Sequence, residues 1–214
     1  MRPSTPAIRE KPHRLPRDAY RGRIRVALTA CVAARRPLFT APHVVEPFVQ
    51  TLRRAATQHL CSVAIYCFMP DHLHLVLQGE EPRADAWGAM VEFKQHSGFW
   101  LSQQHPGVRW QKDFYDHVIR ADEDLRSHLR YIANNPVRQR LVDDWASYPF
   151  TGSIGFDLRS VLEYADGSAL ERVRLHGRVC RRAAREGSAW SVGAPLLGCA
   201  TLCAARLQHR LSVA

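Results

Sequence analysis

The 214-residue sequence has no hydrophobic run long enough to cross a membrane. Its longest apolar stretch, residues 26–34, is far shorter than the roughly 20 residues that a transmembrane helix needs. The first 25 residues are rich in Pro and Arg and lack the apolar centre of a secretory signal peptide. We therefore expect a protein without a membrane partner, located in the cytoplasm.

Paired cysteine motifs are also missing. The six cysteines show no CxxC spacing, which argues against a zinc ribbon and against a disulfide-rich secreted scaffold. Two of them, Cys61 and Cys67, lie in an apolar run and are predicted to be buried free thiols. The cysteines therefore favour a reducing compartment.

Acidic residues are too few to balance the basic ones. Twenty Asp and Glu oppose thirty Lys and Arg, giving a net charge of +10, and all but three of the basic residues are Arg. This charge favours a polyanionic partner, because phosphate neutralisation is the main source of non-specific affinity for nucleic acid. Arginine also suits bidentate contacts to phosphate and guanine. A GC-rich genome would explain the preference for Arg over Lys, but not the net charge.

Hydrophobic periodicity predicts an α+β fold, with an antiparallel sheet and helices packed on one face. Strands are expected at residues 23–32, 61–69 and after Pro70-Asp71, and as one or two short strands within 108–120. Helices are expected at 43–60, 83–104 (with a weak point at Gly98) and 122–135. We predict a flexible basic arm at 1–20, a domain at 21–155, and an extension of unknown role at 156–214, with a helix or two within 156–186.

The segment at residues 66–79 carries two histidines separated by one residue. In a strand, His72 and His74 would point to the same face about 6 to 7 Å apart, close enough to share a metal ion. The leucines at 73, 75 and 77 would point to the opposite face. Asp71, next to His72, could orient an imidazole or simply cap the turn.

The helix expected at 122–135 has separate apolar and polar stripes. Its apolar stripe follows i, i+4 and i+7 spacing, at Leu125, Leu129 and Ile132. Asp122 is the expected N-cap. Tyr131 lies off the apolar stripe, where a tyrosine is more often a packing residue than a catalytic one. Asn135, one turn further on, could be a plain C-cap.

Several blocks of the sequence resemble a known family in the right order and spacing. MPDHLHLVLQG resembles the metal-binding strand of the HUH single-tyrosine transposases. WQKDFYDHVIR, DLRSHLRYIANNPVRQRLV and SYPF resemble downstream segments of their REP-associated branch. The resemblance covers roughly residues 20–153. The sequence departs from the family pattern where Gln139-Arg140 replaces a frequent Gly, and beyond residue 153, where nothing matches.

The resemblance implies a ferredoxin-like HUH endonuclease domain that works in DNA transposition and recombination at a bacterial nucleoid. Such an enzyme cleaves and rejoins single-stranded, hairpin-forming DNA through a 5′-phosphotyrosine intermediate. By residue-to-residue match, Tyr131 is the nucleophile, and His72 and His74 bind Mg²⁺ or Mn²⁺ with Asn135 as a third ligand. A neutral ligand set leaves the ion its charge for polarising a phosphoryl oxygen. Relatives include dimers that donate the tyrosine in trans and monomers that act in cis.

Other residues have two possible roles each. Tyr115 is the main rival nucleophile, or packs in the sheet. Trp110 stacks on a base or belongs to the core. His96 and Lys94 approach the substrate or lie on a solvated helix face.

Four arginines are candidate DNA contacts or ordinary solvated charges: Arg35, Arg36, Arg138 and Arg140. Two other classes of protein also remain possible for the chain as a whole. One is a catalytically inactive, domesticated DNA-binding protein with the same fold. The other is a metal hydrolase that uses the histidine pair without a covalent intermediate.

Overall fold

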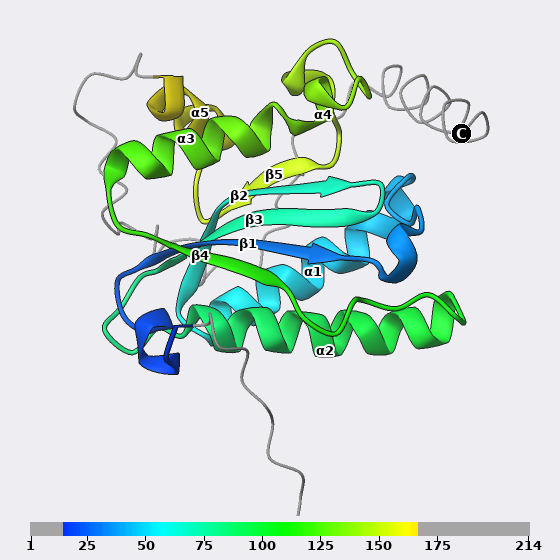
Figure 1. The fold of residues 1–214 in the computed structure, drawn as a ribbon, viewed down its shortest axis with the longest axis horizontal. Helices are drawn as coiled ribbons and strands as arrows, with labels where there is room; N and C mark the ends of the chain where they lie inside the picture. The colour runs from blue at the N-terminus through cyan, green and yellow to red at the C-terminus, as the bar shows by residue number, and fades with distance from the viewer. Residues whose placement is uncertain (1–14, 167–214) are drawn as a thin grey trace, which may run out of the picture.

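A computed structural model describes residues 15–166, apart from the side chain of Glu123, and contains one five-stranded antiparallel sheet (Figure 1). The strand order is β4-β1-β3-β2-β5. The strands are β1 (Arg25–Cys31), β2 (Cys61–Met69), β3 (His72–Gly79), β4 (Tyr115–Ile119) and β5 (Thr151–Ile154). The predicted α+β class with an antiparallel sheet is confirmed, and the histidine-bearing β3 lies at its centre.

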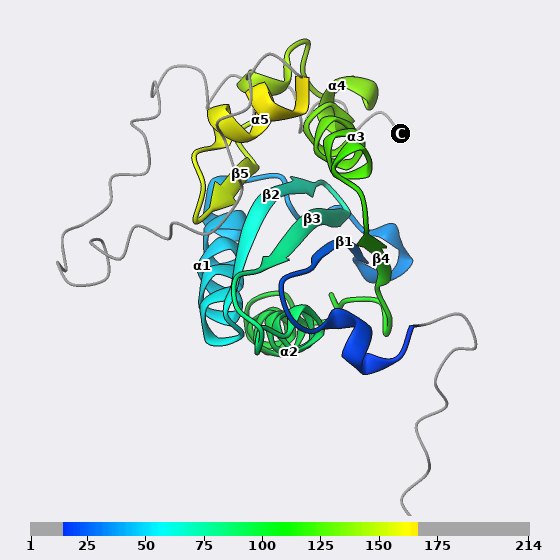
Figure 2. The same cartoon turned by 90° about the vertical axis from the view of Figure 1, so that its left-hand side faces the viewer.

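Helices cover both faces of this sheet. The helices α1 (Pro42–Gln58) and α2 (Ala86–Gln104) lie against one face, and α3 (Asp122–Ala133) and α5 (Leu158–Asp166) lie over the other (Figures 1 and 2). The expectation of helices on one face therefore holds for α1 and α2 but is incomplete. Four short helices complete the described chain: η1 (Arg17–Tyr20), η2 (Ala33–Arg35), α4 (Asn135–Arg138) and η3 (Trp145–Ser147).

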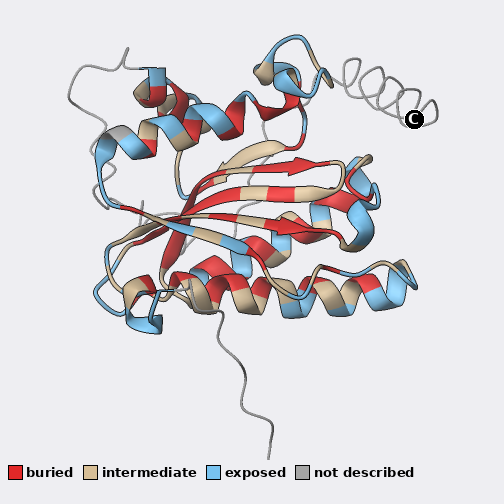
Figure 3. Ribbon diagram, viewed as in Figure 1, coloured by how far each residue is buried: buried red, intermediate tan, exposed pale blue. Residues whose placement is uncertain are grey.

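The two strands predicted on either side of Pro70-Asp71 are present as β2 and β3, and they pair antiparallel as a hairpin. The alternation of β3 follows the period of two. Its leucines, Leu73, Leu75 and Leu77, have no exposed surface and point away from the face that carries the histidines. Figure 3 shows burial concentrated along the strands and on the sheet-facing sides of the helices.

The ends of α3 differ from the prediction. Asp122 is the first helical residue, not the N-cap, and its carboxylate is ion-paired with Arg25, 2.5 Å away. A carboxylate in the first turn still interacts favourably with the helix dipole. The C-cap is Asn134, whereas Asn135 begins α4. Gly98 does not interrupt α2, which runs unbroken to Gln104.

The predicted arm and extension are partly described. Arg17–Tyr20 forms η1 instead of flexible chain, and Tyr20 is buried with its hydroxyl donating to Asp116. In the extension, α5 confirms a helix within 156–186 and buries Val161, Leu162 and Ala165. Positions 1–14 and 167–214 lie outside the described residues, so the rest of the arm and of the extension stays a prediction.

Three cysteines fall in the described part of the chain, and all are buried free thiols. Burial raises the pKa of both Cys61 and Cys67 to about 12, which keeps them protonated and confirms the expectation for this pair. Cys180, Cys199 and Cys203 lie outside the described residues. No helix within residues 15–166 combines the length and the apolar character that crossing a bilayer requires.

Candidate active site

The rings of His72 and His74 converge beside β3. Their Nε2 atoms are 3.0 Å apart, and the ring centroids are 4.6 Å apart with nearly perpendicular planes. Two adjacent ligands of an octahedral ion, each about 2.1 Å from it, would be about 3.0 Å apart. The observed spacing therefore fits two ligands of one divalent ion.

The other nitrogen of each ring has its own partner. His72 Nδ1 lies 2.5 Å from Asp71 Oδ1, and Arg35 Nε lies 3.4 Å from the second oxygen of that carboxylate. Because a carboxylate only accepts hydrogen bonds, His72 carries its proton on Nδ1 and, when neutral, presents a lone pair on Nε2. His74 Nδ1 lies 2.8 Å from Thr29 Oγ1. Such outer partners orient histidine ligands in metal sites.

The electrostatics of the pair also suit a cation. Burial, together with the nearby charges of His72 and Arg35, lowers the pKa of His74 to about 4 against the opposing charge of Asp71. Burial alone would raise the pKa of Asp71, but its hydrogen bond with His72 and the charges of His72 and Arg35 outweigh burial and lower it. At neutral pH His74 is therefore an uncharged imidazole and Asp71 a carboxylate.

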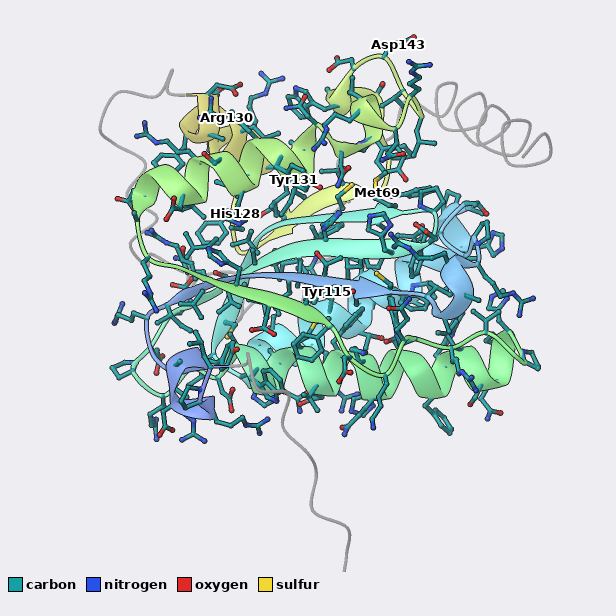
Figure 4. The ribbon with its side chains drawn as sticks, in the orientation of Figure 1. Met69, Tyr115, His128, Arg130, Tyr131 and Asp143 are labelled. Carbon is teal, nitrogen blue, oxygen red and sulfur yellow. The ribbon has the colours of Figure 1, made fainter. Side chains whose placement is uncertain are left out.

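Tyr131 lies on α3 beside the histidines. Its ring is edge-on to His74, with 5.8 Å between centroids, and the guanidinium carbon of Arg138 lies 4.7 Å from the centroid of the tyrosine ring. Figure 4 shows Tyr131 on the sheet-facing side of α3, whereas Arg130 points away from the sheet. The side chain is 47% exposed, so a substrate can reach it. The sequence predicted that Tyr131 lies off the apolar stripe of α3, but not its contacts with His74 and Arg138.

A third metal ligand is less well defined. Within residues 15–166 no cluster of three or more His, Cys, Asp or Glu side chains could hold a metal ion, so a third protein donor would have to be of another type. Asn135 is 4% exposed, and its Nδ2 is buried without a hydrogen-bond partner in the described part of the chain. An amide can turn its oxygen into the position of its nitrogen. Its role as a ligand stays a prediction.

A pocket of about 500 Å³ opens beside Tyr131, between β1, β4 and α3. The rings that line it are those of His74, Tyr115, His117, His128 and Tyr131. Tyr115 is 72% exposed, so the packing role considered for it is wrong. The two tyrosines share one pocket, but the contact with the His74 ring belongs to Tyr131.

Trp110 is a core residue. It is 8% exposed, its Nε1 donates to Ser97 Oγ at 2.9 Å, and its ring packs against Phe39, Phe48 and Phe93. This is the packing role that the sequence left open. A buried ring offers no face to a base, so the DNA contact predicted for Trp110 is wrong.

Of the two candidates on α2, Lys94 has a structural role and His96 is exposed to solvent. Lys94 Nζ donates to the backbone carbonyls of Gln111, Lys112 and Asp113 at 2.8–3.1 Å and so holds the segment that leads into β4. The side chain of His96 is 59% exposed. The helix that carries both residues, α2, lies against the face of the sheet opposite α3, the helix of Tyr131.

The four candidate arginines divide into two groups. Arg35 and Arg138 lie at the site: Arg35 is ion-paired with Asp71, and Arg138 lies over the ring of Tyr131. Arg36 is exposed and donates to the carbonyl of Gly107 at 3.2 Å. Arg140 is exposed just beyond α4, in a left-handed conformation with φ 56°. DNA contacts by all four stay predictions.

Three residues of the site were not assigned a role from the sequence. Thr29 gives no local signal, because threonine is common in strands, and its position opposite His74 comes from the pairing of β1 with β3. His117 and His128 form a parallel stack with 5.2 Å between centroids. The three-residue spacing from His128 to Tyr131 on one helix face was a usable signal.

The described site combines an HxH strand with a tyrosine on the helix that faces it, an arrangement typical of transposases that use a single tyrosine. The family described as "Transposase IS200 like" matches residues 21–135. The chain belongs to this family, in its branch of REP-associated tyrosine transposases.

Individual relatives agree with this assignment. A Haemophilus influenzae protein assigned as a REP-associated tyrosine transposase is 32% identical over 148 residues, covering 63% of this chain and 82% of the relative. The Escherichia coli REP-associated tyrosine transposase is 27% identical over 88 residues, covering 39% and 48%. A solved REP-associated tyrosine transposase bound to a REP hairpin shares the fold, with a TM-score of 0.57 and 20% identity, covering 66% of this chain and 82% of that one.

Proposed function

We propose that this transposase cleaves and rejoins single-stranded, hairpin-forming DNA through a 5′-phosphotyrosine intermediate on Tyr131. We further propose that His72, His74 and Asn135 hold the divalent ion, Mg²⁺ or Mn²⁺, that the reaction uses. One observation carries the proposal: the edge-on contact of the Tyr131 ring with His74, whose Nε2 faces that of His72. The proposed nucleophile and the proposed metal-binding pair thus lie side by side.

The protonation of the histidines supports this role. A bound divalent ion would act as a Lewis acid on a phosphoryl oxygen. Both Nε2 lone pairs must face the ion, so His74 has to carry its proton on Nδ1, where Thr29 Oγ1 accepts it. His72 already carries its proton on Nδ1, toward Asp71. Asp71 therefore selects the tautomer of His72 that would bind metal, and the Thr29 hydroxyl can accept the proton of the corresponding tautomer of His74.

Tyr131 would then exchange one phosphodiester for another. Its phenolic oxygen loses its proton and bonds to phosphorus, the bond from phosphorus to the 3′ oxygen breaks, and that oxygen leaves as a 3′-hydroxyl with a proton. The guanidinium of Arg138, 4.7 Å from the ring centroid, would stabilise the negative charge of the phosphoryl group under attack. Because the phosphotyrosine keeps the bond energy, a second 3′-hydroxyl can reverse the step and rejoin strands.

The proposed partner is a DNA hairpin with unpaired flanking nucleotides. The net charge of +10 and the arginines at the site favour a phosphate-rich ligand, and the solved relative is bound to a REP hairpin. Because His74 and Tyr131 of one chain are in contact, we propose that the tyrosine acts in cis, in a monomer or in each copy of a homodimer. Such an enzyme would work at the bacterial nucleoid.

Tyr131→Phe tests the nucleophile. The variant loses only a hydroxyl, so it should bind a labelled hairpin from the DNA flanking this gene as tightly as the wild type. It should form no covalent adduct on a denaturing gel with Mn²⁺. Tyr115→Phe is the matched control and should keep full adduct formation.

Each alternative gives a different result in this assay. Adducts that persist in Tyr131→Phe and vanish in Tyr115→Phe would move the nucleophile to Tyr115. Cleavage without any adduct, in the wild type and in Tyr131→Phe alike, would indicate a hydrolase. Binding without cleavage at any Mn²⁺ concentration would indicate an inactive DNA-binding protein.

A further inference from the structure

We infer that the pocket beside Tyr131 binds one unpaired nucleobase of the cleaved strand, next to the scissile phosphate, and that Tyr115 is the main surface on which this base stacks. This inference rests on the proposed function, because it takes single-stranded DNA as the ligand. It adds a base-binding subsite and assigns Tyr115, His117 and His128 to it.

The lining of the pocket suits a flat, uncharged group. Tyr115 and His117 contribute rings from β4, and His128 contributes one from α3. None of the residues that line the pocket is Lys or Arg, and Asp116 is among them, so a phosphate would be poorly held there. Bases, in contrast, stack on aromatic rings whatever their sequence.

His117 and His128 line one side of the pocket as a stacked pair. Their rings are 5.2 Å apart and within 11° of parallel. His128 Nδ1 lies 2.7 Å from the Asp124 carbonyl, which only accepts, so His128 donates from Nδ1 and its ring orientation is fixed. A spacing of 5.2 Å leaves no room for a base between the rings of His117 and His128, so a base must lie beside the stacked pair.

Tyr115 offers the open aromatic surface. It is 72% exposed on β4, an edge strand of the sheet. Stacking of a base would remove this surface from water. The pocket volume of about 500 Å³ lies in the range that accommodates a small ligand.

The position of Tyr115 places such a base close to the reacting phosphate. Tyr115 pairs with Thr29 across β1 and β4, and Thr29 pairs with His74 across β1 and β3, so the three residues form one row on the sheet. Strands are spaced about 4.8 Å apart, which puts Tyr115 about 10 Å from His74 along this row. That separation suits a nucleotide adjacent to a phosphate held at the histidines.

The test uses the full chain and a hairpin oligonucleotide from the flanking DNA with a single-stranded 5′ tail. 2-Aminopurine replaces one tail base at a time, and stacking is read as fluorescence quenching on binding. We expect quenching to peak at one tail position. Tyr115→Ala should abolish that peak and weaken binding about tenfold, the effect of losing one base–aromatic stack. Tyr115→Phe should keep both the peak and the affinity.

Phe99→Ala is the matched control, because Phe99 is 69% exposed on α2 and does not line the pocket. It should change neither quenching nor affinity. An abasic nucleotide at the quenched position should weaken wild-type binding about tenfold and Tyr115→Ala binding little further. Circular dichroism would show that each variant is folded.

Two results would overturn the inference: equal quenching in Tyr115→Ala and the wild type, or a full additional loss from the abasic nucleotide in Tyr115→Ala. Either can occur while Tyr131 adducts form normally, which leaves the proposed function intact. Conversely, a position-specific quench that depends on Tyr115, without any adduct, would support the base pocket and refute the cleavage reaction.

Discussion

Thr29 should control metal affinity without touching the metal. Its Oγ1 lies 2.8 Å from His74 Nδ1, and it is the side chain that can accept a proton held there. Thr29→Val keeps the size and branching of the side chain but removes the acceptor. Metal binding would then leave the part-buried Nδ1 proton of His74 without its Thr29 partner.

The size of the effect follows from that lost hydrogen bond. A buried donor without a partner costs about 1–3 kcal/mol, and 1.4 kcal/mol is a factor of about ten in affinity. Removing an outer-shell partner of a metal ligand typically weakens metal binding about 10- to 100-fold. We therefore expect the Mn²⁺ dissociation constant of Thr29→Val to rise by about 10- to 100-fold.

Isothermal titration with Mn²⁺ measures this change directly, and the Mn²⁺ dependence of adduct formation should shift by the same factor. Thr29→Ser restores a hydroxyl and should recover most of the affinity. Thr51→Val is the matched control, because Thr51 Oγ1 donates to the Pro47 carbonyl within α1, 2.8 Å away. A folded Thr29→Val that binds Mn²⁺ as tightly as Thr51→Val would refute the tautomer argument.

Two further predictions concern charge around the site. The pKa of His74 is about 4 in the folded protein, below the ordinary 6.5, so the unfolded chain binds more protons between these values and stability falls as the pH drops through them. In urea unfolding without metal, His74 should lower the free energy of unfolding by about 2 kcal/mol between pH 7 and pH 5, and His74→Gln should lack this loss. Equal pH dependence of the unfolding free energy in the two proteins would contradict the burial of His74 as an uncharged ring. Arg138→Ala should slow single-turnover adduct formation about tenfold at saturating Mn²⁺, because a guanidinium is lost beside the phenol. Arg54→Ala, exposed on α1 over the other face of the sheet, should leave that rate unchanged.

The parts of the site that could be predicted from the sequence are those set by local periodicity. The period of two along β3 places His72 and His74 together, and the helical repeat places Tyr131 on a different face from the apolar stripe of α3. Trp110 shows the limit of such reasoning, since the sequence cannot tell whether its ring faces Ser97 or solvent. The predicted N-cap role of Asp122 was wrong because its carboxylate is ion-paired with Arg25, which is distant in the sequence.

The rest of the site depends on the strand order β4-β1-β3-β2-β5, which no local pattern encodes. Insertion of β1 between β3 and β4 brings Thr29 to His74 and also places Tyr115 in the same row. The strand β1 thus contributes both to the proposed metal site and to the proposed base pocket. If so, a change at Thr29 should alter Mn²⁺ affinity but not base stacking, and a change at Tyr115 should alter base stacking but not Mn²⁺ affinity, even though the two residues are paired across β1 and β4. Strong coupling between them would instead mean that the base and the ion occupy one shared site.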